Sequence, residues 1–320
     1  MSAETINRGG VRPGGRSLPQ AGHRDGAPAR KRRRIRWQPA WMFMAPSLLI
    51  LGVFVVWPIV VSFWYSLHDW TIGAATQQWV GFGNYVKLFH DPQFWNALGN
   101  TLEFTIASVV ILVILGFLAA LGLMSEGLFS RMVRSVFFFP TIVSLTSIGL
   151  VWRFLLDPDI GLVAGLTQFF GATPIGWLQS TTLALPAIIF VDVWKNVGFT
   201  MIILLAGLKG VPQERYEAAR LDGANGRQLV RFVTVPGIRP TLLFATMILT
   251  IQSLQVFDLV YVMTGGGPVF STDTLVTEIF RDGFVNFQTG YASAISWVLF
   301  IVIMAISAFL LRVFRYNDVD

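Results

Sequence analysis

The chain of 320 residues contains no cysteine, which excludes disulfide bonds, thiolate catalysis and cysteine-ligated metals. Its three histidines, His23, His68 and His90, are scattered and lack the H-E-x-x-H spacing of a zinc site. A phosphate loop of the form G-x-x-x-x-G-K-[ST] is also missing. We therefore predict a non-catalytic chain that carries no cofactor or metal and does not bind and hydrolyse ATP itself.

Charged residues are scarce as well. They make up 13% of the chain, whereas 54% of the residues are hydrophobic, so a water-soluble domain of this length would lack polar surface. Six apolar stretches are long enough for a helical span, which requires roughly 20 residues. They run from 41 to 67, 101 to 124, 135 to 156, 182 to 208, 240 to 263 and 289 to 313. We predict an all-α polytopic membrane protein with six transmembrane helices, in which neighbouring helices satisfy the carbonyls freed by Pro46, Pro58, Pro140 and Pro186.

The ends of the chain differ from this apolar body. Residues 1–40 are rich in Gly, Pro, Ala and Arg and show no apolar periodicity, so they cannot bury enough surface to offset chain entropy. We predict a disordered basic tail at 1–40, a six-span domain at 41–316 and a C-terminal tail at 317–320. The basic run 30–36 in isolation suggests nucleic-acid binding or a targeting signal, but it adjoins the first span, where basic residues fix topology and attract anionic headgroups.

The distribution of Lys and Arg sets the orientation, because cytoplasmic loops carry the excess of these residues. One set of loops and ends holds twenty of them: Arg8, Arg12, Arg16, Arg24, Arg30, Lys31, Arg32, Arg33, Arg34, Arg36, Arg131, Arg134, Lys209, Arg215, Arg220, Arg227, Arg231, Arg239, Arg312 and Arg315. The alternate loops hold three, Lys87, Arg153 and Arg281. We therefore expect both termini to face the cytoplasm.

A polar, Arg-rich island lies between Pro212 and Pro236, flanked by two apolar stretches. Within it the order is Glu217-Ala218-Ala219, then Gly223, then Val233 and Val235-Pro236. This order resembles the EAA pattern of binding-protein-dependent ABC importer permeases (EAA, three residues, G, nine residues, I-x-L-P), with two aliphatic substitutions.

The residue types of the island independently predict a helix, a corner and a second helix. Pro212 suits the first turn of a helix, and Gly223 can adopt the left-handed conformation that ends one. Ala218 and Ala219 allow another protein to approach closely, with charge around them from Glu214, Arg215, Glu217 and Arg220. The alternative is a solvated loop with helical propensity.

The resemblance extends over residues 41 to 315 and points to the carbohydrate branch of these permeases, of the lactose, oligosaccharide or glycerol-phosphate type. Further segments that resemble this branch lie at 83–85, 91–95, 100–101, 194–199, 205–208, 257–261 and 264–268. The resemblance implies the architecture of a type I ABC importer permease and a location in a prokaryotic plasma (inner) membrane.

It also implies an assembly. The partners are a second related permease, two ATPase subunits that bind ATP and Mg, and an extracytoplasmic solute-binding protein. Glu217, Ala218, Ala219 and Gly223 are the expected contacts with the ATPases, and their role is mechanical.

Polar side chains inside spans are candidates for the substrate path, since polar groups in hydrocarbon are costly and usually face a cavity or one another. The candidates are Asp192, Lys195, Gln252, Gln255, Asp258, Ser293, Ser296 and Trp297. Asp192 and Lys195 are three residues apart and could pair. Interhelical hydrogen bonds and a buried ion pair need no ligand, so a purely structural role stays open for them. Asp258 could instead organise the following glycine loop.

That loop, with Thr264, Gly265, Gly266, Gly267 and Pro268, is expected to be irregular, exposed outside and in contact with the binding protein. Neutral sugar is favoured as cargo because Lys195, with Asp192 one turn away, is the one Lys or Arg placed well inside a span. Glycerol 3-phosphate or a glycerophosphodiester stays open, since the partner permease can supply its own cation. A membrane enzyme is a remote alternative, because the chain shows neither paired carboxylates nor a His and metal cluster at a membrane face. An ion channel is also remote, because the polar island at 212–236 would then have no purpose.

The asymmetry of the basic residues yields a test of topology. A reporter active only in the cytoplasm is expected to work when fused after Asp320 or inserted near Asn225, and to fail near Gln77 or Gly266. Reporter activity relative to the amount of fusion protein is the measurement. A cytoplasmic signal at Gly266 would overturn the six-span arrangement.

Overall fold

The computed structural model describes residues 38–71, 73–74 and 76–316. Most of the predicted disordered tail (1–37) and the C-terminal tail (317–320) therefore lie outside the described residues. The chain divides into two compact units, residues 1–52 and residues 53–320. The described part of the first unit is mainly helix α1 (Gln38–Leu51), so residues 38–40, which we expected in the tail, are helical.

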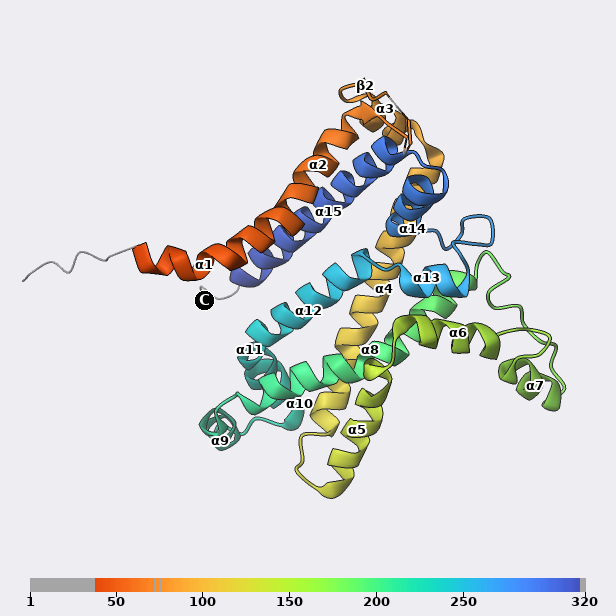
Figure 1. Cartoon of the computed structure of the whole chain (residues 1–320). Helices are drawn as coiled ribbons and strands as arrows, with labels where there is room; N and C mark the ends of the chain where they lie inside the picture. The colour runs from red at the N-terminus through yellow and green to blue at the C-terminus, as the bar shows by residue number, and fades with distance from the viewer. Residues whose placement is uncertain (1–37, 72, 75, 317–320) are drawn as a thin grey trace, which may run out of the picture. The chain divides into compact units, whose positions relative to one another are not determined.

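Helices make up most of the described chain, as the fold class predicts (Figure 1). In chain order the elements after α1 are a π-helical turn η1 (Gly52–Val56), α2 (Trp57–Ser66), β1 (His68–Asp69), β2 (Gln78–Trp79), α3 (Gly83–His90), α4 (Pro92–Gly122), α5 (Leu128–Ile142), α6 (Leu145–Leu155), α7 (Leu162–Phe169), α8 (Ala184–Lys209), α9 (Gln213–Leu221), α10 (Gly226–Leu229), a π-helical turn η2 (Val230–Thr234), α11 (Val235–Gly237), α12 (Arg239–Leu254), α13 (Asp258–Met263), α14 (Leu275–Phe280), a π-helical turn η3 (Arg281–Val285) and α15 (Thr289–Tyr316). The two short strands pair antiparallel, with His68 opposite Trp79.

Four helical stretches are long and apolar enough to cross a membrane: Phe43–Ser66, Pro92–Gly122, Ala184–Lys209 and Thr289–Phe314. They match the first, second, fourth and sixth predicted spans. The other two predicted spans correspond to bent helix pairs, and counting each pair as one span gives six.

The third predicted span is not one continuous helix. α5 and α6 meet at an angle of 97°, with Val143 and Ser144 in extended conformation between them. Pro140 lies inside the last turn of α5 and has no N–H to donate, which weakens the helix at this point. The chain closes the turn with a bond from Val143 N to Pro140 O and then changes direction.

The fifth predicted span is interrupted too. α12 ends at Leu254, residues 255–257 are not helical, and α13 begins at Asp258. The predicted helix from 240 to 263 is therefore two helices, α12 and α13, joined by these three residues. At its other end, α12 follows the α10–α11 segment at an angle of 69°.

The core of the second unit forms where α4, α5 and α12 pack on or beside α8 (Figure 1). Buried Phe104, Leu112, Ile188 and Leu249 belong to one apolar cluster between these helices. Glycines bring helices together, since a Cβ at Gly198 of α8 would overlap the carbonyl oxygen of Phe137 in α5. Small residues at contacts are the usual means by which membrane helices approach each other closely.

A buried polar cluster surrounds α14. Asp273 pairs with Arg281 at 2.6 Å, and Tyr291 donates to Asp91 at 2.7 Å. Glu278 is only 1% exposed, and its Oε2 atom has no hydrogen-bond partner among the described residues. Burial, and then the neighbouring carboxylates of Asp282 and Asp273, raise the pKa of Glu278 to about 8. Burial also raises the pKa of Asp273, against the lowering effect of Arg281.

These pKa values predict how stability depends on pH. A folded-state pKa above the unfolded value means that the neutral carboxyl of Glu278 favours the fold, so stability declines as pH rises from the unfolded value of about 4.5 through about 8. The thermal midpoint of the purified protein in detergent should fall as pH rises from about 5 to about 8, and Glu278→Gln should reduce that fall. The matched control, Glu214→Gln on exposed α9, should keep the wild-type dependence. An unchanged pH dependence in the Glu278→Gln variant would show that Glu278 is not the group responsible.

Candidate functional site

The island at 212–236 folds as predicted into a helix, a glycine corner and a second helical segment. α9 begins after Pro212 and is followed by Gly223 with φ of +85°. Gly223 N donates to Arg220 O and Ala224 N donates to Ala219 O, at 3.0 and 2.9 Å. This is the Schellman motif, in which a left-handed glycine lets the chain satisfy the last carbonyls of a helix.

The second helix of the island has its own start. Asn225 and Gln228 form a capping box, with reciprocal bonds between each side chain and the other residue's backbone N–H. Tyr216 OH donates to Thr234 Oγ1 at 3.2 Å and so ties α9 to η2. Hydrogen bonds therefore hold the corner on both sides.

The surface of α9 and of the corner that follows it is exposed. No residue of α9 is buried; Glu217 and Ala218 are exposed and Ala219 is half-buried. Two large apolar side chains, Leu221 and Phe232, are also exposed here. The surface combines small, charged and apolar groups, which suits contact with another protein.

A second connection lies on the same side. Lys209, the last residue of α8, pairs at 2.9 Å with Glu126 in the link between α4 and α5. The Lys209 ammonium lowers the pKa of this exposed carboxyl. The pair is exposed on both sides, so its contribution to stability is small.

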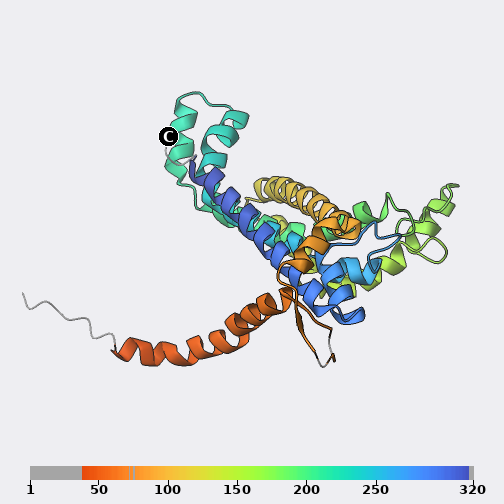
Figure 2. The same cartoon turned by 90° about the horizontal axis from the view of Figure 1, so that it is seen from above.

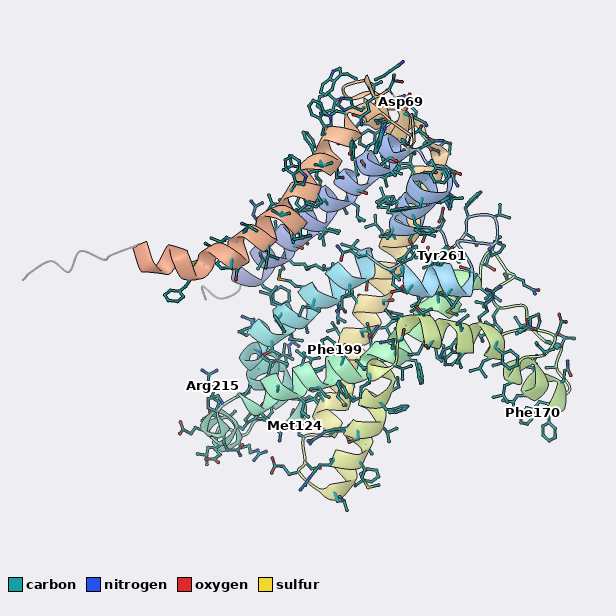
Figure 3. The ribbon with its side chains drawn as sticks, viewed as in Figure 1. Asp69, Met124, Phe170, Phe199, Arg215 and Tyr261 are labelled. Carbon is teal, nitrogen blue, oxygen red and sulfur yellow. The ribbon has the colours of Figure 1, made fainter. Side chains whose placement is uncertain are left out.

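A cavity of about 420 Å³ lies between α4, α5, α8, α12 and the start of α13. Five of the eight predicted substrate-path residues line it: Asp192, Lys195, Gln252, Gln255 and Asp258. Phe199, which lines the same cavity, lies near the middle of α8 (Figure 3). The structure thus brings together residues that are up to 66 positions apart in sequence, from Asp192 to Asp258.

The pairing of Asp192 with Lys195 that the sequence allows is not present as an ion pair. The two described side chains form no ion pair within 4.0 Å, and each has another partner. Asn196 Nδ2 donates to Asp192 Oδ1 at 2.8 Å, whereas Lys195 Nζ donates to Thr141 O at 3.2 Å. Thr141 O lies in the last turn of α5, where carbonyls lack helical partners and attract cations, so the lysine turns toward α5.

The wall formed by α12 is polar. Gln252 and Gln255 line the cavity, and Ser253 beside them is buried. Asp258 starts α13 and lines the same space, and among the described residues no hydrogen bond joins its side chain to the glycine loop. The position of Asp258 favours the cavity over the loop-organising role.

Three predicted residues lie elsewhere. Ser293, Ser296 and Trp297 belong to α15, which packs against α2, and none of them lines the cavity. Ser296 Oγ donates to Ala292 O, and the Trp297 ring packs edge-on against Phe63 with centroids 5.0 Å apart. These contacts are those of helix packing.

The cavity also has lining residues that the sequence did not single out for the substrate path, among them Thr141, Asn196, Phe199 and Phe257. Asn196 and Phe199 follow Asp192 and Lys195 by four residues each, so an i, i+4 search along α8 would have found them. Thr141 and Phe257 lie at the two helix interruptions, which the apolar pattern does not reveal.

The glycine loop is irregular, as expected, but only partly exposed. Gly265 and Gly266 have positive φ, and Gly266 is buried against Asp273. The loop is held on α4, since Asn100 Nδ2 donates to Phe270 O and to Asp273 O. Val269 and Phe270 are more exposed than most of residues 264–268, so the accessible tip of the loop lies just beyond the predicted segment.

Several proteins are similar in sequence to this chain over most of its length. Residues 112–318 match the family described as binding-protein-dependent transport system inner membrane component. The probable ABC transporter permease protein y4oQ of Sinorhizobium fredii is 34% identical over 95% of this chain and 99% of its own. The lactose transport system permease protein LacF of Rhizobium radiobacter is 34% identical over 83% of this chain and 91% of its own.

The fold has a solved counterpart. The crystal structure of a bacterial ABC transporter involved in the import of the acidic polysaccharide alginate contains a chain that aligns with a TM-score of 0.77 at 24% identity, covering 88% of this chain and 96% of that one. The predicted ABC importer permease fold is confirmed by this likeness. The chain belongs to the binding-protein-dependent transport system inner membrane components, and is a non-catalytic, multi-pass permease of an ABC transporter.

Proposed function

We propose that this permease forms the path by which an ATP-driven importer moves a carbohydrate delivered by an extracytoplasmic binding protein. The observation that carries the proposal is the cavity of about 420 Å³, which lies within the range of roughly 300–1,000 Å³ typical of small-molecule sites. The lactose transporter LacF, at 34% identity, supports the class of cargo.

The cavity offers the groups that sugar hydroxyls bind. A hydroxyl both donates and accepts hydrogen bonds, and an amide does the same, so Asn196, Gln252 and Gln255 are suited to it. Asp192 provides an acceptor, and the rings of Phe199 and Phe257 provide apolar surface for the faces of a sugar ring. Such a site binds by several modest contacts, which suits a cargo that must also be released.

The charge of the lining favours a neutral cargo over glycerol 3-phosphate or a glycerophosphodiester. The ionisable lining residues are Asp192, Asp258 and Lys195, which give two carboxylates to one ammonium. The ammonium already donates to Thr141 O. An anion entering this half of the path would meet net negative charge, so the chain itself supplies little to attract it.

The assembly that we propose contains a second related permease, two ATPase subunits that bind ATP and Mg, and the binding protein. Both termini and α9 face the cytoplasm, as the distribution of Lys and Arg indicates. Glu217, Ala218, Ala219 and Gly223 contact an ATPase, and the loop from Thr264 to Phe270 contacts the binding protein.

The geometry suggests how motion of the ATPases reaches the cargo. α9 is tied to η2 through Tyr216, and η2 continues through α11 into α12. α12 ends at the cavity, where Gln252 and Gln255 lie. A displacement of α9 therefore moves the polar wall of the cavity, which changes its access from one side of the membrane to the other.

A valine at the corner should uncouple the transporter. Gly223 has a left-handed backbone, which a β-branched residue adopts at a cost of about 1–3 kcal/mol, so Gly223→Val should distort the corner. Gly226→Val is the matched control, because Gly226 is an exposed residue close to the corner, at the start of α10, where φ is not positive and a side chain has open space. Uptake and transport-stimulated ATPase activity in vesicles should fall for the first variant only, at equal amounts of membrane protein. Normal uptake by a well-expressed Gly223→Val protein would contradict the coupling role.

Substitution of the cavity wall should weaken cargo uptake. Loss of one hydrogen bond costs about 0.5–1.5 kcal/mol, so Gln252→Ala is expected to raise the KM for uptake roughly 2- to 10-fold. Ser296→Ala is the control, since its hydroxyl donates within α15 and does not line the cavity. Uptake rates over a range of concentrations of sugar-loaded binding protein give the KM of both variants. If Ser296→Ala were impaired and Gln252→Ala were normal, the path would run along α15 instead.

A further inference from the structure

The segment between α6 and α8 contains an apolar surface that the proposed transport function does not use. From residue 160 to residue 191 the sequence has no Asp, Glu, Lys or Arg, and the flanking charges are Asp159 and Asp192. α7 lies in this segment, at the end of α8 opposite α9 in both views (Figures 1 and 2). Phe170 and Arg215 accordingly appear at opposite ends of the second unit (Figure 3).

α7 has one side packed against the protein and one side exposed. On one side, Val163 packs against the main apolar cluster and Ala164 is buried. On the other side, Leu162, Leu166 and Phe169 recur at i, i+4 and i+7 and are all exposed. Phe169 is 83% exposed and Phe170, which follows the helix, is 81% exposed, with Ile160 extending the same apolar surface.

Turns on both sides delimit α7. Before the helix, the Asp157 carboxylate accepts from Asp159 N and Ile160 N, at 2.9 and 3.1 Å, which orders the turn that leads into α7. At the end, Gly171 has φ of +75°, Gly171 N donates to Gln168 O and Ala172 N donates to Thr167 O. This is the same Schellman motif that ends α9.

An aqueous loop would not present such a surface. Contiguous exposed apolar side chains without charge are unfavourable in water and usually have a covering partner. α7 connects two membrane-spanning segments, α5–α6 and α8, and the adjacent α6 also exposes Leu150, Val151 and Phe154. The apolar surface of α7 thus continues that of a span, and lipid is the partner that covers such a surface.

We propose that α7 lies in the headgroup region on the side of the membrane away from the cytoplasm. Leu162, Leu166, Phe169 and Phe170 are inserted there at the boundary between headgroups and acyl chains. Helices with Leu and Phe on one face occupy this zone in the plane of the membrane. In this position α7 anchors the connection between α6 and α8 at the bilayer surface. α8 is one of the helices that form the cavity, so this anchor holds one end of the cavity.

Site-directed spin labelling tests the location, and the natural absence of cysteine means that no background thiols need removal. Phe169→Cys and, separately, Leu166→Cys carry a nitroxide, and Asp159→Cys is the aqueous control on the same connection. The assembled transporter is placed in phosphatidylcholine and phosphatidylglycerol vesicles, and power saturation is measured with oxygen and with a water-soluble nickel chelate.

The labels at 169 and 166 should be readily accessible to oxygen and protected from nickel, and the label at 159 should show the reverse. Nickel access at 169 and 166 equal to that at 159 would overturn the proposal in favour of a water-exposed helix. Protection from both reagents would overturn it in favour of a protein partner. Sugar uptake by the unlabelled wild-type transporter in the same vesicles tests the proposed function separately, so an inactive wild type together with lipid-like labels would count against the proposed function alone.

Discussion

The hydrocarbon of a membrane supplies no hydrogen bonds, so every interruption of a spanning helix must be satisfied within the protein. At the break after α5, Lys195 donates to Thr141 O and Thr141 Oγ1 donates to Lys195 O. This exchange fixes the end of α5 against the middle of α8. At the end of α12, Gln255 N and Val256 N bond back to Gln252 O and Ser253 O.

The cavity lies where these two interruptions meet. Thr141 and Lys195 belong to the first break, Gln252 and Gln255 to the second, and all four line the same space. Broken helices expose polar backbone and side-chain groups at membrane depth, and transporters place binding sites at such points. The side chains that stabilise the fold here are therefore also the ones available to a cargo. Lys195 illustrates the overlap, because its ammonium is already engaged by the backbone of α5.

One device for ending a helix recurs on two surfaces with different roles. Gly171 and Gly223 each adopt the left-handed conformation and close α7 and α9 by the same pair of bonds. α9 is surrounded by Glu and Arg and suits a protein partner in water, whereas α7 has no charge and suits lipid. The side chains around each corner, rather than the backbone geometry, separate the two surfaces.

The sequence by itself determined the membrane class, the approximate positions of six apolar stretches and the helix, corner and helix at 212–236. These depend on local composition and on single residues such as Gly223, whose conformational freedom does not require distant contacts. Only the tertiary structure decided that the third and fifth stretches are broken, that Lys195 turns to Thr141 and not to Asp192, and that Ser293, Ser296 and Trp297 lie away from the cavity. Those outcomes depend on which helix lies beside which, and the backbone carbonyl that captures Lys195 comes from a residue 54 positions away, which no local pattern encodes.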